Sequence, residues 1–202
     1  MKAMQNQDNA QYFWQGDKIR LRPVQGQDWE VWYKEATDSH AGRLFNLGIE
    51  LPTSPEIVQG WTEKYANLRE SNDAMVFCIE TLASELVGVI TLHSRNEKNG
   101  RFSFGVRVYR PYRRQGYATE AVRILLRYGF HERRYQKANS ACLEINTESI
   151  RLHQTLGFRE EGRRRRHIYT NGRYYDDILF GLTREEFDDM EQALGSVKGA
   201  QR

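Results

Sequence analysis

Cysteine and clustered metal ligands are scarce in this chain. The 202 residues include two cysteines, Cys78 and Cys142, each inside an apolar stretch. Neither has a partner at the spacing of a disulfide framework or a zinc site, so we expect two buried free thiols. The five histidines are scattered and form no H-x-x-x-H pair. The sequence therefore predicts neither a structural nor a catalytic metal.

Long apolar runs are also missing. No stretch approaches the roughly 18 apolar residues of a membrane helix, and residues 1–12 lack the apolar segment of a secretion signal. We therefore expect a cytoplasmic protein with no membrane partner. The net charge of +3 is too small to indicate a nucleic-acid partner by itself. The length favours a single domain, expected over residues 13–194, between flexible tails at 1–12 and 195–202.

The common nucleotide-binding patterns G-x-x-x-x-G-K-[ST] and G-x-G-x-x-G are both absent. Residues 101–126 carry a different signal. An alternating, strand-like segment at 102–108 leads into the basic turn Arg113-Arg114-Gln115-Gly116-Tyr117-Ala118, and an amphipathic helix follows. Free amides and the helix dipole favour an anion at such a turn, and Gly116 lets the backbone approach it closely. We expect the pyrophosphate of a cofactor there.

The remaining pattern predicts a mixed α/β sheet with helices on both faces. Antiparallel strands come first, and the strand–helix–strand order from 101 to 145 implies a parallel crossover. Asn99-Gly100 and Asn171-Gly172 mark hairpin turns, because both residue types tolerate positive φ. Residues 38–53 are expected to be loop. Strands are expected at 19–22, 75–82, 86–93, 101–109, 138–145, 158–170 and 173–182, and helices after Asp28, from Ser54-Pro55, from Gly116 to about 131, at 147–156 and at 183–194.

Two segments together resemble a known family. Arg113-x-x-Gly116-x-Ala118 matches the [RQ]-x-x-G-x-[GA] coenzyme A loop of the GNAT N-acetyltransferases, and residues 146–158 resemble the family's N-x-x-S…L-G-F segment. The resemblance covers roughly residues 15–190. It is closest to the branch of ribosomal-protein N-terminal (RimJ/RimL-type) and spermidine acetyltransferases. It implies a mostly antiparallel sheet with one splayed parallel strand pair, acetyl-CoA as co-substrate, direct acetyl transfer to an amine in a ternary complex, and a homodimer.

The resemblance also implies roles for individual residues. The backbone of Val106 and Val108 would pair with the pantetheine arm of the coenzyme, and residues Arg113 to Ala118 would hold the diphosphate. Asn146 would bind the arm, although a plain helix cap explains it equally well. Ser149 would lie near the coenzyme sulfur and protonate the departing thiolate; a solvent-facing serine is the alternative. Relatives outside this branch use a tyrosine as that acid, which leaves Tyr169, Tyr174 and Tyr175 open as substitutes.

The general base is harder to assign. An α-amine with a pKa near 8 needs only about 1.4 kcal/mol to be neutral at pH 7, whereas a polyamine amine near 10.4 needs about 4.6 kcal/mol. A polyamine therefore requires a well-placed carboxylate, while a peptide N-terminus manages with a water relay. Glu144, near a strand end, is the predicted base. Glu80 and Glu120 are weaker candidates, and we expect Glu120 to complete hydrogen bonding at the helix start.

The acceptor stays open at this stage. A protein N-terminus is favoured, with a polyamine or small amine as the alternative and a coenzyme-binding sensor without turnover as a third hypothesis. The run Arg163 to Arg166 is the strongest charge cluster. On a regular strand, alternate arginines face opposite sides, so the run forms one stripe only if the strand is irregular. A solvated strand edge is the prediction, with no direct nucleic-acid partner.

Overall fold

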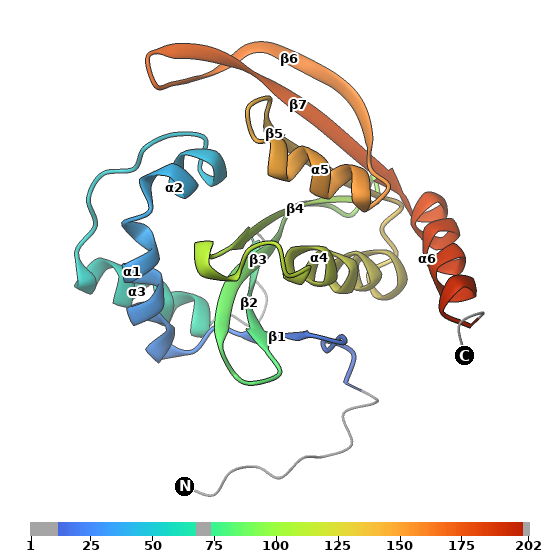
Figure 1. Ribbon diagram of the computed structural model, residues 1–202, viewed down its shortest axis with the longest axis horizontal. Coiled ribbons are helices and arrows are strands. Elements are labelled where there is room, and N and C mark those ends of the chain that lie inside the picture. The colour runs from blue at the N-terminus through green and yellow to red at the C-terminus, as the bar shows by residue number, and fades with distance from the viewer. Residues whose placement is uncertain (1–11, 68–73, 200–202) are drawn as a thin grey trace, which may run out of the picture.

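The computed structural model describes residues 12–67 and 74–199. Within them, the strands form a seven-stranded sheet in the order β1-β2-β3-β4-β5-β7-β6 (Figure 1). All neighbouring strands are antiparallel except β4 and β5, which run parallel. The mixed sheet predicted from the sequence is confirmed. The strand bounds are β1 Ile19–Pro23, β2 Ala74–Thr81, β3 Leu86–Asn96, β4 Arg101–Val108, β5 Lys137–Leu143, β6 Arg159–Thr170 and β7 Arg173–Thr183.

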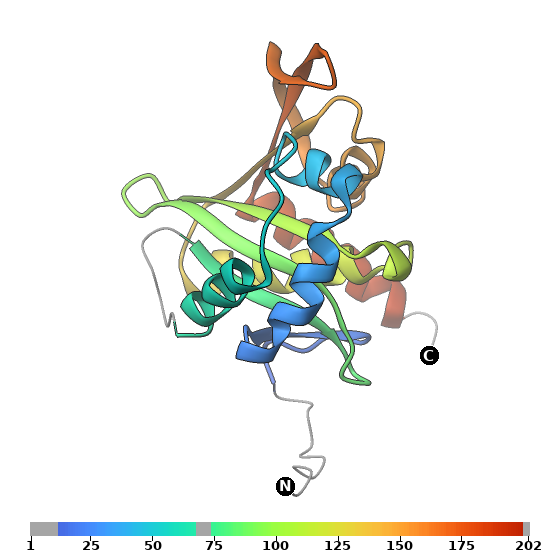
Figure 2. The same cartoon turned by 90° about the vertical axis from the view of Figure 1, so that its left-hand side faces the viewer.

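Helices cover both faces of the sheet, as the alternation of β4 shows (Figure 2). Phe104 points into the core under α4 (Tyr117–Arg127) and meets a ring from α5 (Thr147–Thr155). Gly105 and Arg107 point the other way, toward α2 (Ser39–Phe45) and α1 (Trp29–Ala36). The remaining elements are the 3-10 turns Gly26–Asp28 and Arg110–Tyr112, α3 Pro55–Ala66, a π-helical turn Tyr128–Glu132 after α4, and α6 Arg184–Gly199.

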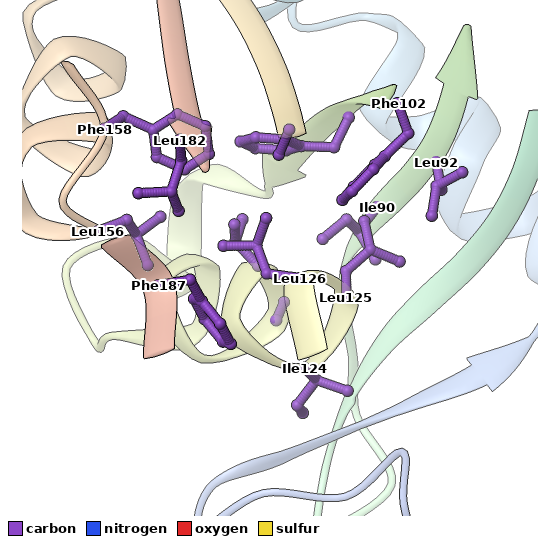
Figure 3. Packing of buried hydrophobic residues seen from close by; sticks show 14 of the residues in the cluster. Ile90, Leu92, Phe102, Ile124, Leu125, Leu126, Leu156, Phe158, Leu182 and Phe187 are labelled. Atoms are coloured by element: carbon purple, nitrogen blue, oxygen red, sulfur yellow. The ribbon is translucent and has the colours of Figure 1, made fainter. Parts of the chain in front are cut away.

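The main hydrophobic core lies between the sheet and α4, whose inward residues are at most 2% exposed. Truncating a leucine in such a core costs about 2–5 kcal/mol. The start of α4, where the predicted anion loop lies, is therefore anchored by firm packing. Figure 3 shows these side chains meeting partners from the strands and from the α5 and α6 regions: Ile124, Leu125 and Leu126 lie against Ile90, Leu92, Phe102, Leu156, Phe158, Leu182 and Phe187.

Several local predictions are confirmed by backbone geometry. Ser54 caps α3 by accepting from the Ile57 amide, with Pro55 in the first turn. Asn171 and Gly172 both have positive φ at the tip of the β6–β7 hairpin. Thr183 caps α6 reciprocally with Glu186. Both cysteines are free and buried. These features depend on neighbours close in sequence, which is why a local pattern predicts them.

Three predictions need correction. Residues 39–45 form α2 rather than loop, because Asp38 caps the amide of Ala41. α6 continues to Gly199, so the predicted tail from residue 195 begins with helix. Asp28 makes no side-chain cap to α1, since Arg22 and the Gln25 amide occupy its carboxylate. The hairpin predicted at Asn99-Gly100 is confirmed, since β3 and β4 pair antiparallel on either side of this turn, and Gly100 is the residue there with positive φ.

The predicted N-terminal tail, residues 1–12, lies outside the described residues except for Tyr12. Among the described helices, none combines the length and the apolar character needed to cross a membrane.

Candidate active site

β4 and β5 separate along their length. They pair only at Arg101↔Lys137, Phe102↔Ala138 and Ser103↔Asn139, although β4 continues to Val108 and β5 to Leu143. Beyond Ser103 the facing edges of the two strands are unpaired. The result is a V-shaped opening in the middle of the sheet, bounded by backbone.

The open edge of β4 presents the backbone of Val106 and Val108. The Tyr109 amide donates to the Val87 carbonyl on β3, at 2.9 Å. Along an antiparallel strand, alternate residues direct their N–H and C=O groups to opposite neighbours. The amides of Val106 and Val108 therefore face the opening, where β5 does not reach them. The Val108 carbonyl accepts from Arg113 Nε at 3.1 Å.

The basic turn closes the wide end of this opening at the start of α4. Gly116 is the N-cap residue, with φ of +85° in the left-handed region that favours glycine. Among the described residues, the backbone amides from Gln115 to Ala118 have no hydrogen-bond partner. Free amides at a helix N-terminus are a binding site for an anion. The geometry is that expected from the sequence.

A segment before β1 supports this turn, which the sequence pattern did not reveal. Lys18 Nζ donates to the Gln115 carbonyl at 2.9 Å, and the Lys18 amide donates to Glu120 Oε1 at 3.0 Å. A Cβ on Gly16 would lie 1.8 Å from that same oxygen. Glu120 thus binds the amide of another segment, where we expected it to complete its own helix terminus. Its carboxylate is committed to holding the loop.

The N-termini of α4 and α5 face one another across charged side chains. Glu148, in the first turn of α5, lies 3.6 Å from Arg113 Nη1 and 3.9 Å from Arg114 Nη2. Arg114 is 90% exposed, so this pairing is weak. Glu148 had no signal in the sequence, because the pairing arises only when the two helix starts are brought together.

Asn146 and Ser149 are both placed at the start of α5. Asn146 Oδ1 accepts from the Ser149 amide at 3.1 Å, so the helix-cap interpretation is confirmed. The hydroxyl of Ser149 contacts the Cys142 thiol and lies 3.5 Å from His153 Nδ1. Burial raises the pKa of Cys142, and the hydrogen bond with Ser149 opposes that rise. The thiol therefore stays protonated at neutral pH.

His153 lies beneath Ser149 and is 2% exposed. Its ring stacks on Phe180, with centroids 4.5 Å apart. Burial lowers the pKa of His153, so the ring is neutral near pH 7. Nδ1 lies 2.7 Å from the Ser149 carbonyl and must carry the proton that it donates there. Nε2, left as an acceptor, has no partner in the described structure.

Two of the carboxylates considered as the general base, Glu144 and Glu80, have hydrogen-bond or ion-pair partners in the structure. Glu144, just after β5, accepts from the Asp176 amide at 3.0 Å through Oε1. Glu80 is held between Arg20 Nε at 2.5 Å and Arg22 Nε at 2.6 Å, on strands at the far side of β3. That ion-pair network occupies Glu80 and separates it from the opening. Glu80 is therefore excluded as a base.

The three candidate tyrosines lie on the β6–β7 hairpin. Tyr169 and Tyr174 are exposed, with ring centroids 5.0 Å apart. Tyr175 is buried, and its hydroxyl accepts from Arg173 Nε. Tyr175 precedes Asp176, which bonds to Glu144 at the end of β5, so the hairpin lies beside the opening and the role of these tyrosines as general acids stays a prediction.

A charged wall lies on the other face of β4, opposite the basic turn. Arg107 Nη2 donates to the Glu35 carbonyl at 2.7 Å and lies 3.9 Å from the Glu35 carboxylate. Burial raises the pKa of Glu35, opposed by the charge of Arg107. From α2, Arg43 Nη1 donates to Thr170 Oγ1 at 2.6 Å, near the hairpin tip. α1, α2 and the hairpin tip therefore enclose this side of the opening.

Comparison with known proteins agrees with this geometry. The family model for the GNAT acetyltransferase domain matches residues 18–159. An uncharacterized N-acetyltransferase, YokL, derived from the SPbeta prophage of Bacillus subtilis, is 35% identical over 176 residues, which is 87% of this chain and 96% of the relative. Spermidine N(1)-acetyltransferase of Escherichia coli is 22% identical over 170 residues, covering 84% of this chain and 88% of the relative.

Among solved structures, the spermidine N-acetyltransferase of Vibrio cholerae in complex with CoA and spermine is similar in fold. The TM-score is 0.73 at 19% identity, with 84% of this chain and 97% of that chain covered. The splayed strand pair, the basic turn at the start of α4 and these matches point to one conclusion. The chain is a GNAT N-acetyltransferase.

Proposed function

We propose that the protein transfers the acetyl group of acetyl-CoA directly to a primary amine, with a protein N-terminal α-amine as the favoured acceptor. The observation that carries the proposal is the unpaired β4 edge at Val106 and Val108, which leads to the free amides around Gly116. An amide-rich arm can pair with such an edge as an added strand would, and a diphosphate suits the helix start. The residues present therefore fit the coenzyme.

Acetyl-CoA, when bound, supplies the acetyl group as an activated thioester. The residues of this chain would position the coenzyme and offer it polar and positively charged groups. Backbone N–H groups on the open edge of β4 are available to a carbonyl oxygen, and such contacts are worth about 3 kcal/mol of barrier. Arg113 and Arg114 supply positive charge beside the free amides. The amide nitrogen of Asn146 stays available for the arm because its oxygen serves as the cap.

Direct transfer is favoured because the chain offers no competent acyl-accepting thiol. Burial raises the pKa of both Cys78 and Cys142, and both are nearly inaccessible. A thiol that is buried and protonated is a poor nucleophile. We assign Ser149 as the donor of the proton to the departing thiolate, since its hydroxyl contacts Cys142 on β5, one of the two splayed strands.

For the base, Glu144 is the candidate carried from the sequence. Oε1 is held by the Asp176 amide, and Oε2 has no hydrogen bond among the described residues, which leaves it for a water relay. Glu35 offers a second carboxyl group on the opposite face, where burial raises its pKa toward that of a working base. Comparing E144Q with E35Q separates them: the true base loses kcat at pH 7 and regains part of it as pH rises.

The test is incubation with acetyl-CoA and either Ser- or Ala-initiated peptides or spermidine, read by CoA thiol release and mass spectrometry. Acetylated peptide at higher kcat/KM than acetylated spermidine supports the proposal. The similarity to spermidine acetyltransferases makes a polyamine the second candidate, and a spermidine preference would select it. Tight CoA binding with no product from any amine would leave a coenzyme-binding sensor.

A further inference from the structure

The β6–β7 hairpin is irregular where its arginines lie. The register moves from Arg164↔Asp177 to Ile168↔Tyr175, so three residues of β6, 165–167, lie opposite one residue of β7, Asp176. Arg166 has φ of +50°, and its amide donates to Asp176 Oδ1 at 2.9 Å. Residues 165–167 thus form a bulge. The strand alternation that would send neighbouring arginines to opposite sides does not apply there.

Some arginines at this bulge have no ion-pair partner within the described residues. Arg163 pairs with Glu160, and Arg164 pairs with Asp177. Arg165, Arg166 and Arg173, called here the hairpin arginines, have no carboxylate partner in the described residues. The guanidinium of Arg166 lies 5.1 Å from the Tyr174 ring, and that of Arg173 lies 4.8 Å from the Tyr175 ring. Aromatic rings therefore hold two of these charges in place.

The nearby acidic groups are already engaged by other partners. Asp177 is fully buried beside Arg164. Asp176 accepts from the Arg166 amide, and Glu144 accepts from the Asp176 amide. Backbone amides orient Asp176 and Glu144 without neutralising them, so the surface that a ligand would meet combines arginine and tyrosine side chains with these two carboxylates.

The hairpin borders the opening between β4 and β5 on the side that α1 and α2 enclose. The Glu144 amide, at the end of β5, donates to the Asp176 carbonyl at 3.1 Å, so β7 passes the mouth of the V. At the tip, Thr170 bonds to Arg43 of α2. In Figure 1 the β6–β7 ribbon arches over the top of the molecule and ends above α2, and Figure 2 shows it projecting from the domain. On the wall formed by α1 and α2, Arg107 and Arg110 are paired with Glu35 and Asp38.

We infer, resting on the proposed transferase activity, that the hairpin arginines select amine acceptors that carry negative charge close to the reactive amine. The substrate class is a protein N-terminus followed by acidic residues. Arginine clusters attract carboxylates and raise their local concentration, while a polycation such as spermidine is repelled by the same field. Acceptor choice would then depend on charge beyond the first residue.

The experiment uses three peptides of equal length that share the first two residues, Ser-Ala, and the same C-terminal tail. Positions 3–5 are Glu, Gln or Lys. The kcat/KM of each is measured with the whole chain and saturating acetyl-CoA, and binding of the same peptides is measured separately in the presence of CoA. We expect wild type to prefer the Glu peptide over the Lys peptide by about tenfold or more at low salt, with the ratio falling as salt rises.

Two variants assign the effect. R165E/R166E should lower the Glu/Lys ratio by about tenfold and leave the Gln peptide within about twofold of wild type, as expected for steering by charge. R165A/R166A should give an intermediate ratio. The control R101E makes the same change of charge per residue at the first residue of β4, where β4 and β5 are still paired. It should leave the Glu/Lys ratio unchanged. Unfolding midpoints confirm that each variant is folded.

The outcomes separate this inference from the proposed function. Acetylation of all three peptides at equal rates, or a preference for the Lys peptide, overturns the inference and keeps the transferase. Charge-dependent peptide binding without acetylation would support the hairpin as a charge-selective binding surface and would refute the proposed transfer to peptide amines. A change of oligomeric state in R165E/R166E with unchanged selectivity would make the hairpin a contact between copies of the chain and overturn the inference.

Discussion

Replacing Gly116 with valine tests the basic turn most sharply. Gly116 has φ of +85°, and a Cβ there would meet only the flexible Lys18 Nζ, at 3.4 Å. The cost in folding stability should therefore come from the backbone and amount to about 1–2 kcal/mol. Binding should suffer more, because the side chain covers amides that lie free beside it. Losing two amide contacts to an anion costs about 3 kcal/mol, equivalent to roughly a 150-fold rise in the Kd for CoA.

The matched control is Gly172→Val. Gly172 has a similar φ of +76°, and no atom lies within 4 Å of its Cβ position. It should show a comparable stability loss in urea unfolding with an unchanged CoA affinity by calorimetry. If G116V bound CoA within about threefold of wild type, the assignment of the diphosphate to these amides would be refuted. Equal weakening in both variants would trace the loss to stability alone.

Three further predictions concern α5. E148Q removes the anion beside Arg113 and Arg114, so calorimetry should show CoA binding up to about fivefold tighter. The control E185Q on α6 should leave CoA affinity unchanged. Weaker CoA binding in E148Q would contradict the idea that Glu148 competes with the coenzyme for these two arginines. S149A should lower kcat by on the order of 100-fold with little change in CoA affinity, whereas T147A keeps full activity; an unaffected kcat would remove Ser149 as the acid. Burial lowers the pKa of His153, so its contribution to the free energy of unfolding is complete above the unfolded pKa of about 6.5. That contribution is lost as pH falls from there toward the folded pKa, by up to about 1.4 kcal/mol per pH unit. Urea midpoints at pH 7.5 and 5.5 should show a smaller pH dependence in H153F, and an identical dependence would show that the pKa of His153 is the same in the folded and unfolded states.

Local sequence predicted those parts of the structure that depend on local geometry. Gly116 was identifiable because a left-handed residue at a strand-to-helix turn needs glycine. Asn171-Gly172 was identifiable because a two-residue hairpin turn needs two positive φ values. α2 was missed: seven residues containing His40 and Gly42 carry too little helical periodicity, and the Asp38 cap is the only local sign.

Other features arise only from contacts between distant segments. Lys18 reaches Gln115 across 97 positions, and Glu148 meets Arg113 because two helix starts converge. Glu120 was expected at its own helix start, yet it holds the backbone before β1. The bulge at Arg166 is set by its partner strand through Asp176. The pattern within a single segment cannot predict contacts between distant segments, so these contacts become visible only in the tertiary structure.

Amide hydrogen exchange with and without CoA tests the central claim most directly. The amides of Val106 and Val108 face the opening, whereas the Tyr109 amide between them and the turn already donates to Val87. Saturating CoA should slow exchange at Val106, Val108 and Gly116 and leave Tyr109 unchanged. Unaltered exchange at all three of those amides, at a CoA concentration shown by calorimetry to fill the protein, would contradict the account.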